Sequence, residues 1–321
     1  MIDDLVRRAA GDDDVAVEEL SEIADSAPAR LTPHHGLMLD HDLLWPAKLY
    51  RAADEQTVRR VIERVDAGAD RLSLNHLLLV LAHSGHPLAE LALRRWASQP
   101  PPGAGELHVG PLDYAQEGGW TIDADGSRRE LCGDVAYEWL LRAPAPGRAG
   151  DSPDRKTCPW CSSPLWVAAE LDFGKQAVVT ALWHTGWSGR LVVETCYFCA
   201  CYATVFSEVT PDGGASWWPG NIAPAYLPKD EGPEEPPALL PVAGPRRPSP
   251  FRASAWSSGG STLGGRPEWI QDADHPGCPG CGQRMDYLGL IGGSDIDAGE
   301  GAYYLHTHQP CGFTAVNYQQ S

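Results

Sequence analysis

Two cysteine pairs, each with the spacing Cys-x-x-Cys, are the clearest chemical feature of this 321-residue sequence. Cys158 and Cys161 form one pair and Cys196 and Cys199 form the other, with 34 residues between the pairs. This spacing is typical of a zinc ribbon, in which four thiolates surround a tetrahedral zinc ion at about 2.3 Å. We therefore predict a structural zinc site on these four residues. The alternatives are four unliganded thiols or a redox pair.

A second group of potential ligands lies nearer the C-terminus. Cys278 and Cys281 repeat the Cys-x-x-Cys pattern, and Cys311 follows together with His306 and His308. A neutral imidazole nitrogen binds zinc as well as a thiolate does. We predict a second zinc site made of three cysteines and one histidine.

An ungapped comparison of the two groups distinguishes between the histidines. The segment 194–199, Glu-Thr-Cys-Tyr-Phe-Cys, aligns with 306–311, His-Thr-His-Gln-Pro-Cys. His308 then lies opposite Cys196, so we expect His308 to be the ligand. The repeat also predicts that the two groups belong to related zinc-ribbon units.

Both predicted sites are closed, because four protein ligands leave no open coordination position for catalysis. A small β unit buries too little surface for a large core, and metal binding supplies folding free energy instead. Cys132 and Cys201 have no place in either site, and we expect both to be buried thiols.

The periodicity of the sequence predicts the elements that position these ligands. Apolar residues recur at helical spacing over 58–65 and 72–82, and Pro87 suits the first turn of another helix over 88–98. The last two helices resemble one unit of a HEAT-like array. The first part of the chain is therefore predicted to be mainly helical.

Beyond about residue 150, aromatic, β-branched, glycine and proline residues are frequent, with strand-like runs at 177–183 and 204–209. The sequence thus predicts an α+β protein. Its predicted parts are a helical domain over 1–145 with a terminal hairpin at 119–131, a first zinc-ribbon unit over 146–225, a proline-rich linker over 226–262, and a second zinc-ribbon unit over 263–321.

Two other clusters have residue types that bind cations. Histidines and aspartates gather between His34 and Asp42, where they could hold a catalytic metal or form a helix-capping loop. The acidic loop Asp295–Glu300 could hold a cation or form a solvated hairpin tip. The sequence contains no nucleophile elbow, phosphate-binding loop, dinucleotide fingerprint or His-Glu-x-x-His motif. We therefore predict no enzymatic activity.

The charge of the chain bears on its partners. With 43 acidic and 25 basic residues, the net charge is −18, which disfavours binding to a phosphate backbone. No long apolar run predicts a membrane span, and charged residues within 1–10 do not suit a signal peptide. We expect a cytoplasmic protein that contacts neither membrane nor nucleic acid.

The segment 263–271, Leu-Gly-Gly-Arg-Pro-Glu-Trp-Ile-Gln, resembles the signature of the YwqG-like family of bacterial proteins of unknown function. The residues from Cys278 to Gln320 are similar to a zinc-ribbon-bearing branch of that family. The resemblance implies a β-rich fold in a bacterial cytoplasm, where such proteins often look like immunity or binding proteins. It carries over no catalytic residues, and the inserted Cys278 and Cys281 depart from the family's usual pattern.

These features favour a non-enzymatic protein, stabilised by two Zn²⁺ ions, that binds another protein. A bacterial immunity protein that blocks a toxin would suit the acidity, because an acidic surface is steered towards a basic active-site cleft. One alternative is a nucleic-acid or translation-associated zinc-ribbon protein. Another is a metal-dependent enzyme that uses the His34–Asp42 cluster.

Overall fold

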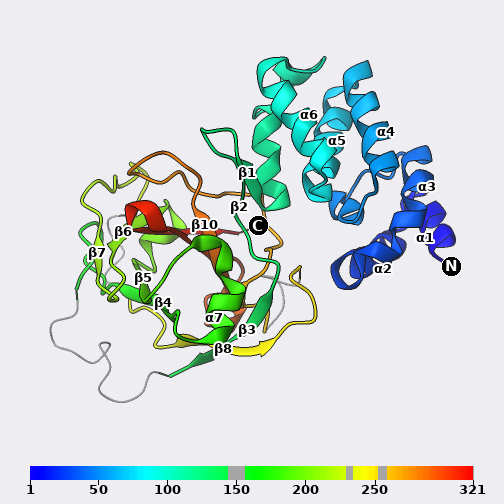
Figure 1. The fold of residues 1–321 in the computed structure, drawn as a ribbon. Coiled ribbons are helices and arrows are strands. Elements are labelled where there is room, and N and C mark those ends of the chain that lie inside the picture. Colours follow the sequence, from blue (N-terminus) through cyan, green and yellow to red (C-terminus); the bar gives the residue numbers. More distant parts are fainter. Residues whose placement is uncertain (144–155, 229–233, 252–258, 321) are drawn as a thin grey trace. The chain divides into compact units, whose positions relative to one another are not determined.

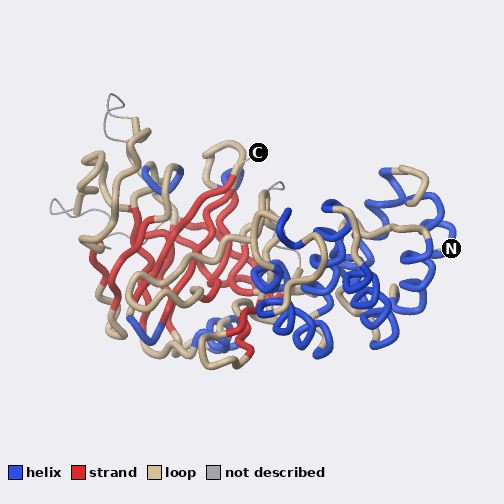
Figure 2. The backbone as a smooth tube through the Cα atoms, turned by 90° about the horizontal axis from the view of Figure 1, so that it is seen from above, coloured by secondary structure: helices blue, strands red, loops and turns tan. Residues whose placement is uncertain are grey.

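The computed structural model describes residues 1–143, 156–228, 234–251 and 259–320, and it divides into two compact units (Figure 1). Unit 1 comprises Met1–Arg129 and unit 2 comprises Glu130–Ser321. Helices predominate in unit 1, and most of the strands, red in Figure 2, belong to unit 2. The α+β class is therefore confirmed.

Unit 1 contains the three helices predicted from periodicity, together with three earlier ones. The helices are α1 (Ile2–Ala9), α2 (Asp14–Ser26), α3 (His35–Asp40), α4 (Glu55–Ala67), α5 (Arg71–Ser84) and α6 (Pro87–Ser98). Aspartate side chains accept hydrogen bonds from first-turn N–H groups of α2, α4 and α5, which stabilises the start of each helix. Gly85, with φ of +57°, ends α5 in the left-handed conformation that favours glycine.

The core of unit 1 is a single cluster that includes Tyr50, Trp96 and Trp120. The hairpin predicted around the Asp-Gly turn is confirmed as β1 (Trp120–Ile122) paired with β2 (Arg128–Glu130). No helix among the described residues is both long and apolar enough to cross a bilayer.

Unit 2 is built on an antiparallel sheet, which has eight strands in the described part of the chain. Their order is β7-β6-β12-β11-β10-β9-β3-β8. The bounds are β3 (Ala136–Arg142), β6 (Val205–Val209), β7 (Ala215–Trp217), β8 (Leu240–Arg246), β9 (Thr262–Gly264), β10 (Asp286–Gly292), β11 (Ala302–His308) and β12 (Phe313–Gln319). Every residue of β10 and β11 is buried, so these central strands are covered on both faces.

A separate hairpin of β4 (Trp166–Asp172) and β5 (Arg190–Thr195) packs against the large sheet. Leu171 and Leu191 of the hairpin share one buried cluster with Leu305 and Val316 of the sheet. This burial fixes the hairpin that carries the first cysteine group.

The compact units differ from the predicted division into parts. Unit 1 ends at Arg129, before the predicted boundary at 145, because β3 already belongs to the large sheet through its pairing with β8 and β9. The predicted boundary itself lies in 144–155, outside the described residues. The two cysteine groups do not form separate domains, because β6 pairs with β12 in one sheet.

The predicted proline-rich linker over 226–262 contains strand β8 and the start of β9. Pro241 and Pro245 are tolerated in β8 because it is the last strand of the sheet and needs N–H donors on one side only. Of the rest of this segment, 229–233 and 252–258 lie outside the described residues.

The strand predicted at 177–183 is wrong, whereas the strand predicted at 204–209 is confirmed as β6. Residues Gln176–Ala181 form helix α7, in which Val178 and Ala181 are buried. The β-branched residues that suggested a strand carry only a small helix penalty, and burial of one helical face overrides it.

Candidate metal centres

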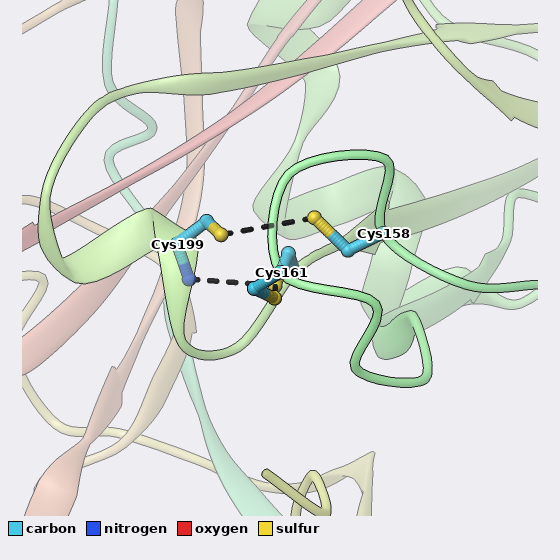
Figure 3. A group of neighbouring side chains, drawn as sticks. Cys158, Cys161 and Cys199 are labelled. Atoms are coloured by element: carbon cyan, nitrogen blue, oxygen red, sulfur yellow. Dashed lines mark hydrogen bonds between the residues drawn. The ribbon is translucent and has the colours of Figure 1, made fainter. Parts of the chain in front are cut away.

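The first cysteine group is formed by two turns that the β4–β5 hairpin brings together. Cys158 and Cys161 lie in the turn that precedes β4, and Cys196 and Cys199 follow β5. The four sulfur atoms all lie within 4.8 Å of one another. The Sγ atoms of Cys158 and Cys199 are 3.7 Å apart, and those of Cys161 and Cys196 are 3.5 Å apart. In Figure 3 the sulfurs of Cys158 and Cys199 face each other. Sulfurs at the corners of a tetrahedron around zinc would be about 3.8 Å apart, so this geometry suits a tetrahedral ion.

Electrostatics in the first group favour a bound cation. Hydrogen bonds from Cys196 and Cys199 lower the pKa of Cys158 strongly, whereas the hydrogen bond with Cys158 raises the pKa of both partners. One thiolate is therefore stabilised by its neighbouring thiols, and further ionisation is opposed by charge repulsion. A divalent cation at the centre would stabilise all four thiolates.

The second group comprises Cys278, Cys281, His308 and Cys311, whose candidate ligand atoms also lie within 4.8 Å of one another. The Cys281 sulfur lies 3.9 Å from each ring nitrogen of His308. Burial raises the pKa of Cys278 and, together with hydrogen bonds to its neighbours, raises that of Cys311 to about 12. A nearby cation would therefore stabilise the thiolate form of both residues.

Gln283 orients His308, a role that sequence reasoning did not predict. The Nε2 atom of His308 lies 3.2 Å from the Gln283 Oε1 atom, an oxygen that only accepts. A proton on Nε2 would satisfy this contact and would leave Nδ1 as the nitrogen able to bind a metal ion. Such an outer hydrogen bond is usual for metal-binding histidines. The position of Gln283, two residues after Cys281, was its only sequence signal.

The two Cys-x-x-Cys turns have the same backbone hydrogen bonds. The Cys158 N–H donates to the Ser163 carbonyl at 2.8 Å, and the Cys278 N–H donates to the Gln283 carbonyl at 2.7 Å. The residue after each pair is left-handed, with φ of +65° at Ser162 and +79° at Gly282. The structural equivalence of the turns supports the repeat seen in the sequence.

The hairpins that follow the turns are also equivalent. Pairing of β4 with β5 is interrupted between Val167 and Ala169, and pairing of β10 with β11 is interrupted at the corresponding place, between Tyr287 and Gly289. A bulge shared at the same offset indicates a common plan for both hairpins.

The register of these strands distinguishes the role of His308 from that of His306. Glu194 pairs with Val167 and His306 pairs with Tyr287, so His306 occupies the place of Glu194. His306 is fully buried, and its Nε2 atom lies 3.1 Å from the Asn317 side-chain oxygen. His308 is the histidine that the structure brings to the cysteines.

The two other cysteines differ in environment. Cys132 is 2% exposed and packs beside Tyr287 and Tyr304, so its predicted burial is confirmed. Cys201 was predicted to be a core thiol, but it is exposed. It follows Cys199 in a single 3₁₀ turn at the surface, and its sulfur lies 3.3 Å from the Tyr303 hydroxyl.

The His34–Asp42 segment forms no cation-binding group in the part of the chain that the structure describes. Its side chains have separate partners. These are Asp3 for His34, the Leu49 carbonyl for His35, Arg60 for Asp40 and Arg64 for Asp42. Most of the segment is helix α3, and its histidines and aspartates are not gathered into one group.

The loop Asp295–Glu300 uses its first carboxylate within the fold. Asp295 accepts hydrogen bonds from the backbone N–H groups of Gly259 and Ser261 and from the Ser261 hydroxyl. Tyr318 donates to the Glu300 carbonyl. These contacts hold the loop against neighbouring segments of unit 2.

A cavity of about 700 Å³ lies apart from both cysteine groups, between the β4–β5 hairpin, α7 and β8. Its charged lining residues are Glu170, Asp172, Lys175 and Arg190. None of the eight metal-ligand candidates lines it, so the cavity gives no access to either group.

Comparison with known proteins adds one relative. The chain is 31% identical over 260 residues to the uncharacterized protein YpfL of Salmonella typhimurium strain LT2. The match covers 76% of this chain and 58% of YpfL, so this chain spans less than two thirds of the length of that relative. No protein-family model and no solved structure matches the chain.

Proposed function

We propose that this chain is a non-enzymatic, protein-binding protein whose β-rich unit is stabilised by two structural zinc ions. The observation that carries the metal assignment is the presence of two groups of four sulfur or imidazole donors, each gathered within 4.8 Å. Thiolate-rich tetrahedral donor sets select zinc over hard cations such as magnesium or calcium. Four protein donors in each site fill the coordination shell, so zinc would hold the fold together.

The finer architecture belongs to the same proposal. The paired turns and their hairpins are consistent with two zinc-ribbon units merged into one sheet. Helices α5 and α6 would form a HEAT-like pair in unit 1. The segment 263–271 supports membership of the YwqG-like family, in its zinc-ribbon-bearing branch.

The partner we propose is a basic protein, specifically a toxin domain that this chain occludes as a bacterial immunity protein. The net charge of −18 supports this choice, because an acidic surface accelerates association with a basic partner and repels acidic competitors. The same charge argues against the nucleic-acid alternative, since phosphate binding requires clustered lysine and arginine. The separate partners of His34, His35, Asp40 and Asp42 argue against the enzyme alternative, which relied on that cluster.

Elemental analysis tests the zinc assignment directly. The purified full-length chain is expected to hold two zinc ions per molecule, and Cys158→Ser or Cys278→Ser should each reduce the content to one. A wild-type preparation with clearly fewer than two ions, unchanged by either substitution, would refute the assignment.

The partner is tested separately by affinity capture from the native host at low salt. We expect a stoichiometric basic protein that is released at high ionic strength and whose toxicity is suppressed by co-expression of this chain. The same capture at about 1 M salt, where the screening length falls to about 3 Å, is the control. Salt-sensitive capture of RNA or DNA instead would favour the nucleic-acid alternative.

A further inference from the structure

The two metal centres differ in how far their ligands are exposed. In the first centre, Cys158, Cys196 and Cys199 are buried and only Cys161 is partly accessible. In the second centre, Cys281 is exposed and Cys311 is partly accessible. The two donor sets are similar, but the second is more exposed to solvent than the first.

The residue inside each Cys-x-x-Cys turn also differs between the two centres. Trp160 of the first turn packs edge-on against Trp217, with ring centroids 5.1 Å apart, and both are partly buried. The equivalent residue in the second turn is Gly280. A Cβ atom at Gly280 would lie 3.2 Å from both the Cβ and Sγ atoms of Cys311, tighter than most side-chain contacts. The close approach of Cys311 thus favours glycine and leaves the second turn without an aromatic cover.

A neighbouring tryptophan does not replace this cover for Cys281. Trp218 packs edge-on against Phe206 and Phe313 in a small cluster that also contains Cys278 and Cys311. Cys281 is not part of this cluster. The aromatic side chains therefore shield one side of the second centre and leave the Cys281 side open.

We propose that the second metal centre is a thiol modification site, in which the Cys281 sulfur reacts with hydrogen peroxide and the centre releases its metal while the first centre keeps its own. This inference rests on the proposed binding of a metal ion by both centres. The difference in solvent exposure between the two centres is the reason for this proposal, because oxidation of cysteine follows thiolate character and exposure.

The chemistry balances within the centre. The Cys281 thiolate attacks one oxygen of the peroxide, so an S–O bond forms, the O–O bond breaks, and hydroxide leaves. A second thiolate of the same centre then attacks the Cys281 sulfur, so an S–S bond forms, the S–O bond breaks, and another hydroxide leaves. The two thiolates lose two electrons and the peroxide gains them. One sulfur donor and His308 remain, which is too few for a closed tetrahedral site.

Metal release under hydrogen peroxide tests the proposal on the full-length chain. With a chromophoric chelator in excess, we expect one metal ion per chain in a fast phase and the second at least ten times more slowly. Peptide mass spectrometry after the fast phase should find Cys281 in a disulfide and the first four cysteines reduced. Equal release rates, or a disulfide that forms first among Cys158, Cys161, Cys196 and Cys199, would overturn the proposal.

A substitution in the first turn gives a matched comparison. Trp160→Gly copies the second turn and should accelerate release from the first centre several-fold while the release rate of the second centre stays unchanged. Trp160→Phe keeps an aromatic cover and should retain the slow phase. If Trp160→Gly holds two metal ions but releases the second as slowly as wild type, the role of the aromatic cover is wrong. Fewer than two metal ions in the wild-type chain before peroxide is added would instead refute the proposed metal sites themselves.

Discussion

The Sγ atoms of Cys158 and Cys199 lie 3.7 Å apart, although the two residues are 41 positions apart in the chain. The β4–β5 hairpin closes this separation, and its buried face against the large sheet holds it closed. The geometry of the first cysteine group and the packing of unit 2 therefore depend on each other.

Loss of one ligand should accordingly lower both the metal content and the free energy of unfolding. We expect Cys199→Ser to bind one metal ion instead of two and to lower the free energy of unfolding of unit 2 by at least about 3 kcal/mol, because metal binding supplies folding free energy. This corresponds to a fall of about 6–12 °C in melting temperature. Cys201→Ser, at an exposed position outside the centre, is the control and should keep both metal ions.

The two histidines of β11 should respond differently to substitution. His308→Ala removes a ligand and should lower the metal content by one, whereas His308→Cys copies the first centre and should retain two metal ions. His306→Ala should also retain two, while destabilising the core by about 2–4 kcal/mol through the cavity that it leaves. Metal analysis and denaturant unfolding distinguish these outcomes. Loss of a metal ion in His306→Ala, with the fold retained, would contradict the assignment.

Gln283 should tune the affinity of the second centre without being a ligand. Gln283→Ala removes the hydrogen bond that orients His308, and we expect metal affinity there to fall about 10–100-fold. Competition with a chelator of known affinity measures the change. Gln309→Ala, at an exposed position beside His308, should leave the affinity unaltered.

Gly264 and Gly282 both have positive φ, but only Gly264 is confined. A Cβ atom at Gly264 would lie 2.8 Å from the Ala181 carbonyl oxygen, whereas none at Gly282 would meet an atom within 4 Å. We expect Gly264→Ala to cost about 2–5 kcal/mol through backbone strain and overpacking, and Gly282→Ala about 1 kcal/mol through strain alone. Denaturant unfolding measures both, and equal costs would show that the close contact has no energetic effect.

His35 should make unit 1 sensitive to acid. Burial lowers its pKa below the ordinary value of 6.5, and its Nε2 atom lies 3.0 Å from the Leu49 carbonyl. The unfolded chain then takes up a proton near pH 6.5 that the folded chain resists, so stability falls as pH decreases below about 6.5. The slope is at most about 1.4 kcal/mol per pH unit for this group.

Chemical unfolding of the full chain, followed by its helical circular dichroism at pH 7.5 and 5.5, measures this dependence. His35→Gln should be less stable than wild type at pH 7.5 but should lose less stability between the two pH values. An unchanged difference between the two pH values in the variant would show that another group causes the acid sensitivity.

The sequence alone determined the local features of this protein. Helical periodicity and Pro87 located α4, α5 and α6, and the Cys-x-x-Cys spacing identified the turns that can present paired sulfurs. The internal repeat selected His308 over His306, because a shared backbone plan keeps the same ligand positions in both units.

Only the tertiary structure decided the features that depend on distant contacts. It made 176–181 a helix and 240–246 a strand, because burial and sheet pairing outweigh weak local preferences. It gave His34, His35, Asp40 and Asp42 four separate partners, joined the segments that carry the two cysteine groups through the pairing of β6 with β12, and left Cys281 exposed. Local sequence sets which donors are available, and packing over long separations sets which of them meet and which face solvent.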